Sequence, residues 1–320
     1  MANTTDLNNI VSSINERYLM GGWCLATLVA SMGGNTLVLV SSLKYNALRL
    51  DKITLVLIEN IAVADLGYAC YIISTFTSVI ANRWVFGELF CKVFNYMHLY
   101  FGMAEIFLIC ALNLSKLTSL LFPLRARIRS KRTGVYIVSV VWCLPLIHII
   151  PSIIFGRTVV FRLTYFRCEG FFANIGLFSK IIPMMTVVCA VLLPMVIVLV
   201  SIVWLLFHLA KVRGIQKQSV VTLLVVSSCY FTSFLPYGIY YVFGGFAEWK
   251  YQFDLAVYFY RFALFMCFLN FSANPIIYYI TITSFRNFVK GGVSRCKFWF
   301  AGKLMIAAQR LVKSGAASRN

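Results

Sequence analysis

The residues of this chain best suited to chemistry are ionisable or amide side chains that stand inside long apolar segments. Asp65, Glu105 and Lys116 carry ionisable groups, and Asn270 and Asn274 carry amides. A charged group inside a lipid bilayer is unstable unless it faces the interior of a helical bundle, where it finds a polar partner or water. We therefore expect these residues to point inward from several membrane helices.

The segments that carry these groups have the composition of a membrane protein. The chain is 61% hydrophobic and only 12% charged, whereas about a quarter of the residues in soluble domains are charged. Successive apolar segments are each long enough to cross a hydrocarbon core of roughly 30 Å. They cover residues 18–43, 54–79, 90–121, 134–155, 179–211, 217–247 and 255–281. The predicted fold class is an all-α integral membrane protein, a seven-transmembrane helix bundle with a short amphipathic helix after the seventh span.

The net charge of +19 is concentrated on one side of this bundle. Lys and Arg gather in 44–53, 116–132, 211–217 and the tail after 281. Basic residues in short loops mark the cytoplasmic face of a membrane protein. The charge therefore predicts a topology, with the N-terminus extracellular and the C-terminus cytoplasmic at the plasma membrane, and it does not predict a nucleic-acid surface.

The expected organisation has three parts: an extracellular tail at 1–17, the bundle at 18–283, and a cytoplasmic amphipathic helix and tail at 284–320. An extracellular tail would make Asn3, in the sequence N-T-T, a glycosylation site. The stretch T-S-F-R-N-F-V-K-G-G after the seventh span has the pattern of a short helix lying on the lipid bilayer. Cys296 beyond it is either a palmitoylation site or an ordinary free thiol.

Several short motifs follow one another along the apolar segments in a fixed order. They are Gly34-Asn35, N-I-A-V-A-D ending at Asp65, W-V-F-G ending at Gly87, Cys91, Trp142, Pro194, F-L-P ending at Pro236, and N-P-I-I-Y from Asn274 to Tyr278. With these motifs, the chain resembles the rhodopsin-like (class A) G-protein-coupled receptors over nearly all of residues 18–290. The resemblance implies a receptor that performs no chemical reaction.

The resemblance also implies a disulfide bond between Cys91 and Cys168. In the family this bond ties the long outer loop to the outer end of the third span. Both cysteines are expected on the oxidising side of the membrane, where disulfides persist. The alternative is a pair of unlinked cysteines.

The intramembrane acids fall where the family binds a sodium ion. Asp65 matches the family's acid, and Glu105 stands where a hydroxyl is usual; Asn270 and Asn274 are the partners from the seventh span. Two carboxylates this close cannot both ionise at low cost, so one is expected to keep a proton. The site would then hold sodium, a proton, or both. The alternative is a protonated structural network without an ion, and no other cofactor is expected.

The inner end of the third span departs most from the family. Its D-R-Y triplet falls on Ser115, Lys116 and Leu117. Lys116 keeps the positive charge without the planar fork of arginine, and Ser115 cannot form the ion pair that helps to hold the resting state. These residues, with Pro236, Asn274, Pro275 and Tyr278, are the predicted coupling and switch residues. Three interpretations stay open: normal coupling through Lys116, altered basal activity or partner choice, and no coupling.

A ligand pocket is expected between the third, fifth, sixth and seventh spans. His98 stands where an aspartate would grip an amine, so a monoamine ligand is disfavoured. Phe268 stands where a lysine would form a retinal Schiff base, so retinal is disfavoured as well. By register, the predicted lining residues are His98, Gly102, Thr186, Phe234, Tyr237, Tyr241, Leu264 and Phe268. The alternative role for each of them is ordinary packing in the bundle.

The predicted function is therefore a receptor that binds an extracellular ligand of unknown type within the bundle and activates a heterotrimeric G protein. Two alternatives remain. One is a binding protein of the same fold that does not couple to G protein, such as a scavenger or a heteromer partner. The other is an ion or proton transporter. The intramembrane acids permit this role, but the internal repeats of many transporters are not evident in the sequence. No motif indicates an enzyme.

Overall fold

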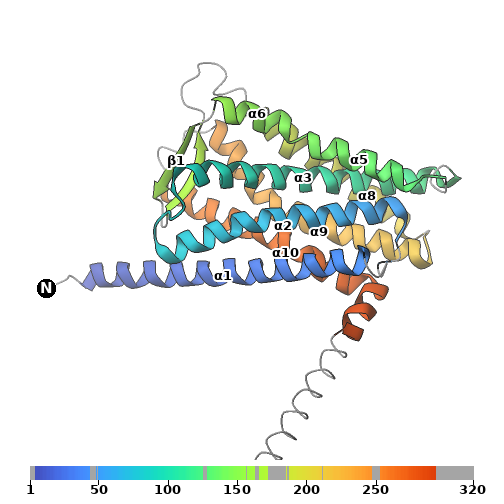
Figure 1. Ribbon diagram of the computed structural model, residues 1–320, viewed down its shortest axis with the longest axis horizontal. Coiled ribbons are helices and arrows are strands. Elements are labelled where there is room, and N and C mark those ends of the chain that lie inside the picture. Colours follow the sequence, from blue (N-terminus) through green and yellow to red (C-terminus); the bar gives the residue numbers. More distant parts are fainter. Residues whose placement is uncertain are drawn as a thin grey trace, which may run out of the picture.

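Figure 1 shows the computed structural model as a bundle of long helices lying side by side, with a small β-hairpin at one end. The structure describes residues 4–43, 48, 50–124, 128–155, 157–162, 166–171, 185, 187–210, 212–246 and 253–292, and side chains for a smaller part of these ranges. The predicted sites at Asn3, Thr186 and Cys296 lie outside the described residues.

The first three helices are α1 (Thr4–Leu43), α2 (Lys52–Ala81) and α3 (Gly87–Leu121). Helix α1 starts well before the predicted residue 18, so much of the stretch expected to be a tail is helical. Helix α2 starts where Asp51 Oδ1 accepts a hydrogen bond of 3.0 Å from Thr54 N, which caps a free backbone donor. Its last turn ends at Asn82, whose φ of 49° is left-handed.

The fourth apolar segment is a broken helix, α5 (Lys131–Cys143) followed by α6 (Leu146–Phe155). The break lies at Leu144 and Pro145, where the chain makes a turn. Proline has no N–H to donate, and its ring clashes with the preceding helical turn. The span predicted over 134–155 thus consists of two successive helices.

The fifth span is described from its middle onward. A π-helix, η1 (Val187–Leu192), leads directly into α8 (Leu193–Leu209). Pro194 lies in the first turn of α8 and is buried. The wider turns of η1 just before this proline let the chain continue where the ordinary backbone hydrogen bond is lost.

The last two spans are α9 (Gly214–Phe246) and α10 (Phe253–Thr281), and each contains a proline in its interior, Pro236 and Pro275. A helix over 283–292 follows α10 and turns away from the bundle at the end opposite the hairpin (Figure 1). This helix matches the predicted amphipathic segment.

The hairpin comprises β1 (Arg157–Arg162) and β2 (Phe166–Phe171), which pair antiparallel with Arg157 opposite Phe171. Both strands pack against α3, and β2 also reaches α2. The hairpin was not predicted; the sequence indicated only a long outer loop here.

The helices form a closed ring. Helix α1 packs against α2 and α10, α2 against α3 and α5, α3 against α8, and α8 and α10 both against α9. At one contact between α1 and α10, a Cβ on Gly34 would lie 2.7 Å from Pro275 Cβ and Cγ, so only glycine fits there. Near the start of α1, Arg261 Nη1 of α10 lies 3.1 Å from Glu16 Oε2.

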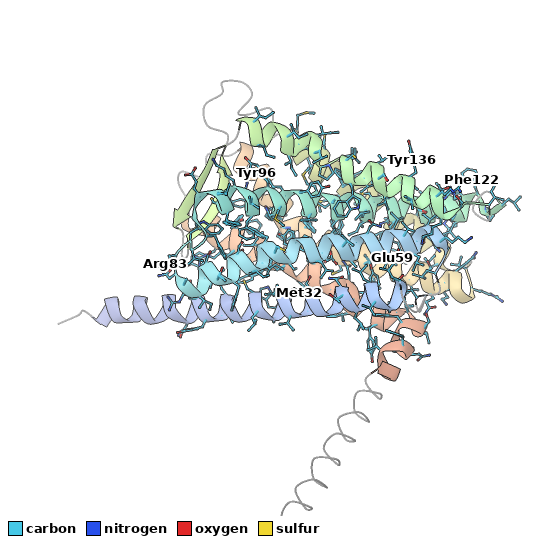
Figure 2. All side chains as sticks on the ribbon, viewed as in Figure 1. Met32, Glu59, Arg83, Tyr96, Phe122 and Tyr136 are labelled. Carbon is cyan, nitrogen blue, oxygen red and sulfur yellow. The ribbon has the colours of Figure 1, made fainter. Side chains whose placement is uncertain are left out.

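The outer faces of the bundle are apolar, as a lipid environment requires. Among the described helices, six are long and apolar enough to cross a membrane, and the shorter α8 continues η1. Met32 and Tyr136 point away from the bundle (Figure 2) and are 46% and 72% exposed. The buried interior holds large aromatic side chains, including Tyr230, Phe268 and Tyr278.

Candidate functional site

The centre of the bundle contains the two predicted acids, both fully buried. Asp65 comes from α2 and Glu105 from α3, and each is 0% exposed. Asn274 Nδ2 of α10 donates to Asp65 Oδ2 at 3.0 Å and to Glu105 Oε1 at 3.2 Å. Asn270 Nδ2, one turn away, donates to Glu105 Oε1 at 2.7 Å. Three helices therefore meet in one polar network, as the sequence predicted for these residues.

The network contains oxygen atoms that accept no hydrogen bond, and no described basic side chain pairs with its acids. Asp65 Oδ1 and Glu105 Oε2 are buried without a hydrogen-bond partner, and neither acid forms an ion pair with any described residue. Hard cations take oxygen ligands, so the donor set fits a sodium ion held by Asp65 and Glu105. A bound cation would supply the positive charge that the network lacks, and a proton on one carboxyl would reduce the same imbalance.

Helix α1 adds a part of this network that the sequence interpretation left out. Asn35 Nδ2 donates to Phe271 O of α10 at 3.2 Å, and Ser31 Oγ donates to Asp65 O at 3.4 Å. Asn35 Oδ1 is buried without a partner, which makes it a further oxygen beside the acids. The signal was present, because Asn35 is an amide within an apolar segment and belongs to a noted motif.

The half of the bundle nearer the hairpin contains an aromatic cluster around His98 of α3. The ring of His98 lies 4.4 Å from that of Tyr71, 5.4 Å from Tyr68 and 6.5 Å from Tyr237. Phe268 lies 6.2 Å from both Tyr68 and Tyr71, all measured between ring centroids. The cluster brings together three predicted ligand residues, His98, Tyr237 and Phe268, with two tyrosines of α2 that were not predicted.

The other predicted ligand residues lie around this cluster or deeper. Gly102 faces Tyr68, whose Cε2 would be 3.6 Å from a Cβ at that position. Leu264 is 2% exposed and stands one turn before Phe268 on α10. Phe234 packs deeper, with ring centroids 5.0 Å from Tyr230 and 6.0 Å from Phe271. Tyr241 belongs to α9, but its side chain lies outside the described part of the chain.

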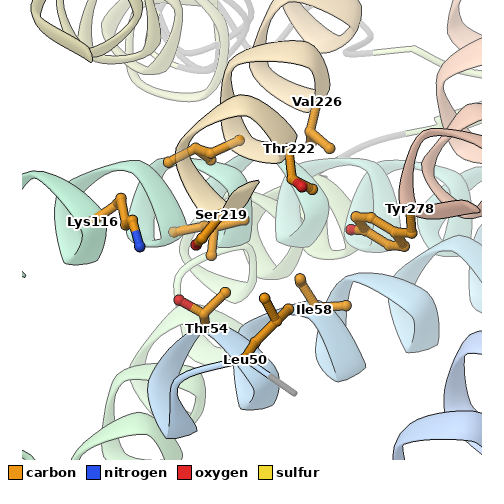
Figure 3. Close-up of a pocket in the computed structure, with 10 residues that line it drawn as sticks. Leu50, Thr54, Ile58, Lys116, Ser219, Thr222, Val226 and Tyr278 are labelled. Carbon is orange, nitrogen blue, oxygen red and sulfur yellow. The ribbon is translucent and has the colours of Figure 1, made fainter. Parts of the chain in front are cut away.

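The end of the bundle away from the hairpin, here called the inner end, contains a small cavity between α2, α3, α9 and α10. Its volume of about 10 Å³ leaves room for roughly one water molecule. Figure 3 shows Lys116 at one side of the cavity and Tyr278 at the other, with Ser219 and Thr222 of α9 between them. The lining residues are Leu50, Thr54, Ile58, Leu112, Lys116, Ser219, Thr222, Leu223, Val226 and Tyr278.

Lys116 is buried without a direct partner. It is 7% exposed and makes no hydrogen bond or ion pair with any described residue. The acid whose charge acts on it is Asp51, the N-cap of α2. Tyr278 is 0% exposed, and its hydroxyl also lacks a hydrogen-bond partner. The cavity is thus bordered by polar groups that are free to bind something else.

The remaining predicted coupling residues are not among the residues that line this cavity. Ser115 is buried and its carbonyl accepts hydrogen bonds from Thr118 and Ser119, while Leu117 is half-buried. Pro236 and Pro275 interrupt the backbone bonding of α9 and α10 above the cavity.

Cys91 of α3 is disulfide-bonded, and seven other cysteines among the described residues are free. The strand that carries Cys168, β2, packs against α3. This placement supports the pairing of Cys91 with Cys168, which stays a prediction because the side chains of β2 lie outside the described part.

Comparison with known proteins covers most of the bundle. Residues 34–278 match the seven-transmembrane receptors of the rhodopsin family. The chain belongs to this family. Members of the rhodopsin family are multi-pass membrane receptors and not enzymes, so the predicted fold class and the absence of an enzymatic role are both confirmed.

Individual rhodopsin-family receptors are distant from this chain. Mouse chemokine XC receptor 1 is 28% identical over 214 residues, or 65% of this chain and 62% of that receptor. Rat galanin receptor type 1 is 25% identical over 283 residues, covering 84% and 81%. Human C-C chemokine receptor type 1 is 24% identical over 279 residues, covering 82% and 76%. The chain therefore spans less than two thirds of the first relative and more of the other two, and no subfamily is fixed.

Proposed function

We propose that the protein binds an extracellular ligand within the helix bundle and activates a heterotrimeric G protein on the cytoplasmic side. The observation that carries this proposal is the inner cavity, where Lys116 and Tyr278 are buried side chains with unused polar groups. Binding would shift the population of bundle arrangements, and the inner end of α9 would move outward. The enlarged cavity would then receive the G protein, with Lys116 offering a positive charge.

The proposed ligand site is the aromatic cluster around His98, with the N-terminus extracellular and the hairpin on the ligand side. Rings of Tyr71, Tyr68 and Tyr237 surround His98 in place of a carboxylate. This environment supports apolar or aromatic contacts and disfavours a monoamine. The galanin and chemokine receptors among the relatives are named for other kinds of ligand, and at this distance they do not determine the ligand here.

The test is nucleotide exchange on a panel of G proteins without ligand. We expect basal exchange by the wild type and its loss in Lys116→Ala, because Ala removes the cation found among the described residues that line the cavity. The double variant Ser115→Asp with Lys116→Arg restores the family triplet and should couple at least as well. If the wild type is silent and only the double variant couples, the coupling proposal is wrong.

A second candidate is a receptor-fold binding protein that does not couple. It is favoured by Lys116, which forms no ion pair with any described acid, and by its neighbour Ser115, which carries no charge. Its test is internalisation of a bound ligand without nucleotide exchange.

A further inference from the structure

Helix α9 forms one side of the inner cavity, and hydrogen bonds to α10 and α3, two of the helices it contacts, hold it there. No described residue of α9 forms an ion pair. The helix is instead bonded to α10 at its inner end and to α3 one to two turns further in. Within the described part of the chain, α9 is thus held by uncharged polar contacts and by no charged one.

The contact with α10 lies at the border of the cavity. Gln218 Nε2 donates to Thr281 O at 2.8 Å and to Thr283 Oγ1 at 3.2 Å. Thr222 Oγ1, one turn later, donates to Thr281 Oγ1 at 2.9 Å. Thr222 is 4% exposed and lines the cavity itself. These bonds would have to break for the inner end of α9 to leave α10.

The contact with α3 is a reciprocal pair of buried side chains. Asn113 Nδ2 donates to Ser227 Oγ at 2.8 Å, and Ser227 Oγ lies 3.1 Å from Asn113 Oδ1, which accepts. Both residues are 0% exposed. Asn113 Nδ2 also donates to Ile109 O within α3 at 2.9 Å, which fixes the orientation of the amide. A buried polar pair separated from its partner would lose its bonds without gaining water.

We propose that these residues form a two-point latch that positions α9 in the closed state. One point joins Gln218 and Thr222 to Thr281 and Thr283, and the other joins Asn113 to Ser227. The latch does the work that an acid–arginine pair at the inner end of the third span would do, and Ser115 and Lys116 cannot supply such a pair. Its effect on signalling rests on the proposed coupling function, whereas its effect on the position of α9 does not.

All side chains of the latch are uncharged, so we expect its strength not to depend on salt. We also expect its strength to fall stepwise as single hydrogen bonds are removed. Removing one hydrogen bond between uncharged groups shifts an equilibrium by roughly 2- to 12-fold, the range of its usual net contribution. Each point contains two or three such bonds, so we expect each point to hold the closed state by roughly 2-fold or more. The two points join α9 to different helices, so the free-energy changes caused by removing each of them should be close to additive.

The experiment measures the distance between spin labels in the full chain reconstituted in nanodiscs. Labels are introduced as non-canonical amino acids at the exposed residues Gln216 of α9 and Arg132 of α5, which leaves the native cysteines in place. The variant Thr222→Val with Gln218→Leu removes the α10 point, and Asn113→Leu with Ser227→Ala removes the α3 point.

The matched control is Thr232→Val. Thr232 lies on α9, is exposed, and donates only to carbonyls of its own helix, Ser228 O and Cys229 O. We expect the long-distance population to rise by roughly 2-fold or more in each latch variant and to stay at the wild-type level in the control. Equal distributions in latch variants and control would overturn the latch, as would a shorter distance in the variants.

Nucleotide exchange on the same samples separates the latch from the coupling proposal. If the long-distance population rises and exchange rises with it, both proposals are supported. If the distance shifts while all variants stay silent toward every G protein, the latch stands and the coupling proposal fails. Should Asn113→Leu with Ser227→Ala fail to fold, the α10 variant alone decides the test, because Val is nearly the same shape as Thr.

Discussion

The centre of the bundle and its inner end both bury charge without an ion pair, yet their surroundings differ. At the centre, Asp65 and Glu105 accept three hydrogen bonds from Asn270 and Asn274 and are closed off from solvent. At the inner end, Lys116 borders a cavity and donates no hydrogen bond to any described residue. One region is a nearly complete network, and the other is an incomplete one.

The difference indicates what each region is built to accept. The centre offers unpartnered carboxylate and amide oxygens in a space enclosed by three helices, which suits a small cation or a proton. The inner end offers an ammonium and hydroxyl groups beside α9, the helix proposed to move outward, which suits a group arriving from outside. The centre is therefore an enclosed acidic site that suits a small internal ligand, whereas the inner end is a basic site that suits a docking partner.

The largest effect is expected from Glu105→Ala. The change removes the acceptor of Asn270 Nδ2 and one of the two acceptors of Asn274 Nδ2, which keeps its bond to Asp65. Each buried N–H left unsatisfied costs about 1–3 kcal/mol. The free energy of unfolding should fall by roughly 2–6 kcal/mol in total, measured by thermal unfolding in detergent. Glu105→Gln keeps an oxygen that can accept a hydrogen bond from Asn270, so its free energy of unfolding should fall clearly less. Equal losses in the two variants would show that the hydrogen bonds do not hold the centre together.

A smaller effect is expected from sodium. If the orphaned oxygens of Asp65 and Glu105 hold the ion, sodium stabilises the folded state by about 2.7 kcal/mol at a concentration one hundred times its Kd. The melting temperature should be higher in sodium chloride than in choline chloride at equal ionic strength. Asp65→Asn, which keeps the shape of the side chain, should abolish the difference. Identical melting in both salts would favour the protonated network without an ion.

Much of the fold could be predicted from the sequence because a bilayer imposes long apolar helices. The spans predicted at 54–79, 217–247 and 255–281 lie close to α2, α9 and α10. The break in the fourth span at Pro145 and the early start of α1 could not be read from hydropathy. Hydropathy measures whether a segment prefers lipid, and it does not report where the backbone turns or where a polar stretch stays helical.

The candidate site was predicted in part, for a similar reason. The acids and amides at 65, 105, 270 and 274 meet because each interrupts an apolar helix and must face inward. Tyr68 and Tyr71 were missed, because aromatic residues in a membrane helix fit either lipid or core. Only the rotation of α2 in the bundle turns them toward His98, and that rotation depends on packing between helices.

The smallest effect is expected from Lys116→Met, and its sign should be opposite to that of Glu105→Ala. Met has a similar length and carries no charge, so it avoids the cost of burying an ammonium that has no hydrogen-bond partner. The free energy of unfolding should stay unchanged or rise by about 1 kcal/mol, measured as for the centre, while nucleotide exchange falls. Stability and activity would then separate at the inner end, as expected of a group kept for a partner.

Lys92→Met is the matched control for this prediction, since both lysines belong to α3. Lys92 Nζ lies 3.4 Å from Glu88 Oε1 in a pair whose side chains are 49% and 80% exposed, and such exposed pairs contribute little to stability. Its replacement should leave both stability and exchange near the wild-type values. If Lys116→Met instead destabilises the protein as strongly as Glu105→Ala, the ammonium is a structural part of the closed bundle. The contrast between a centre held by hydrogen bonds and an inner end with an unpartnered ammonium would then be lost.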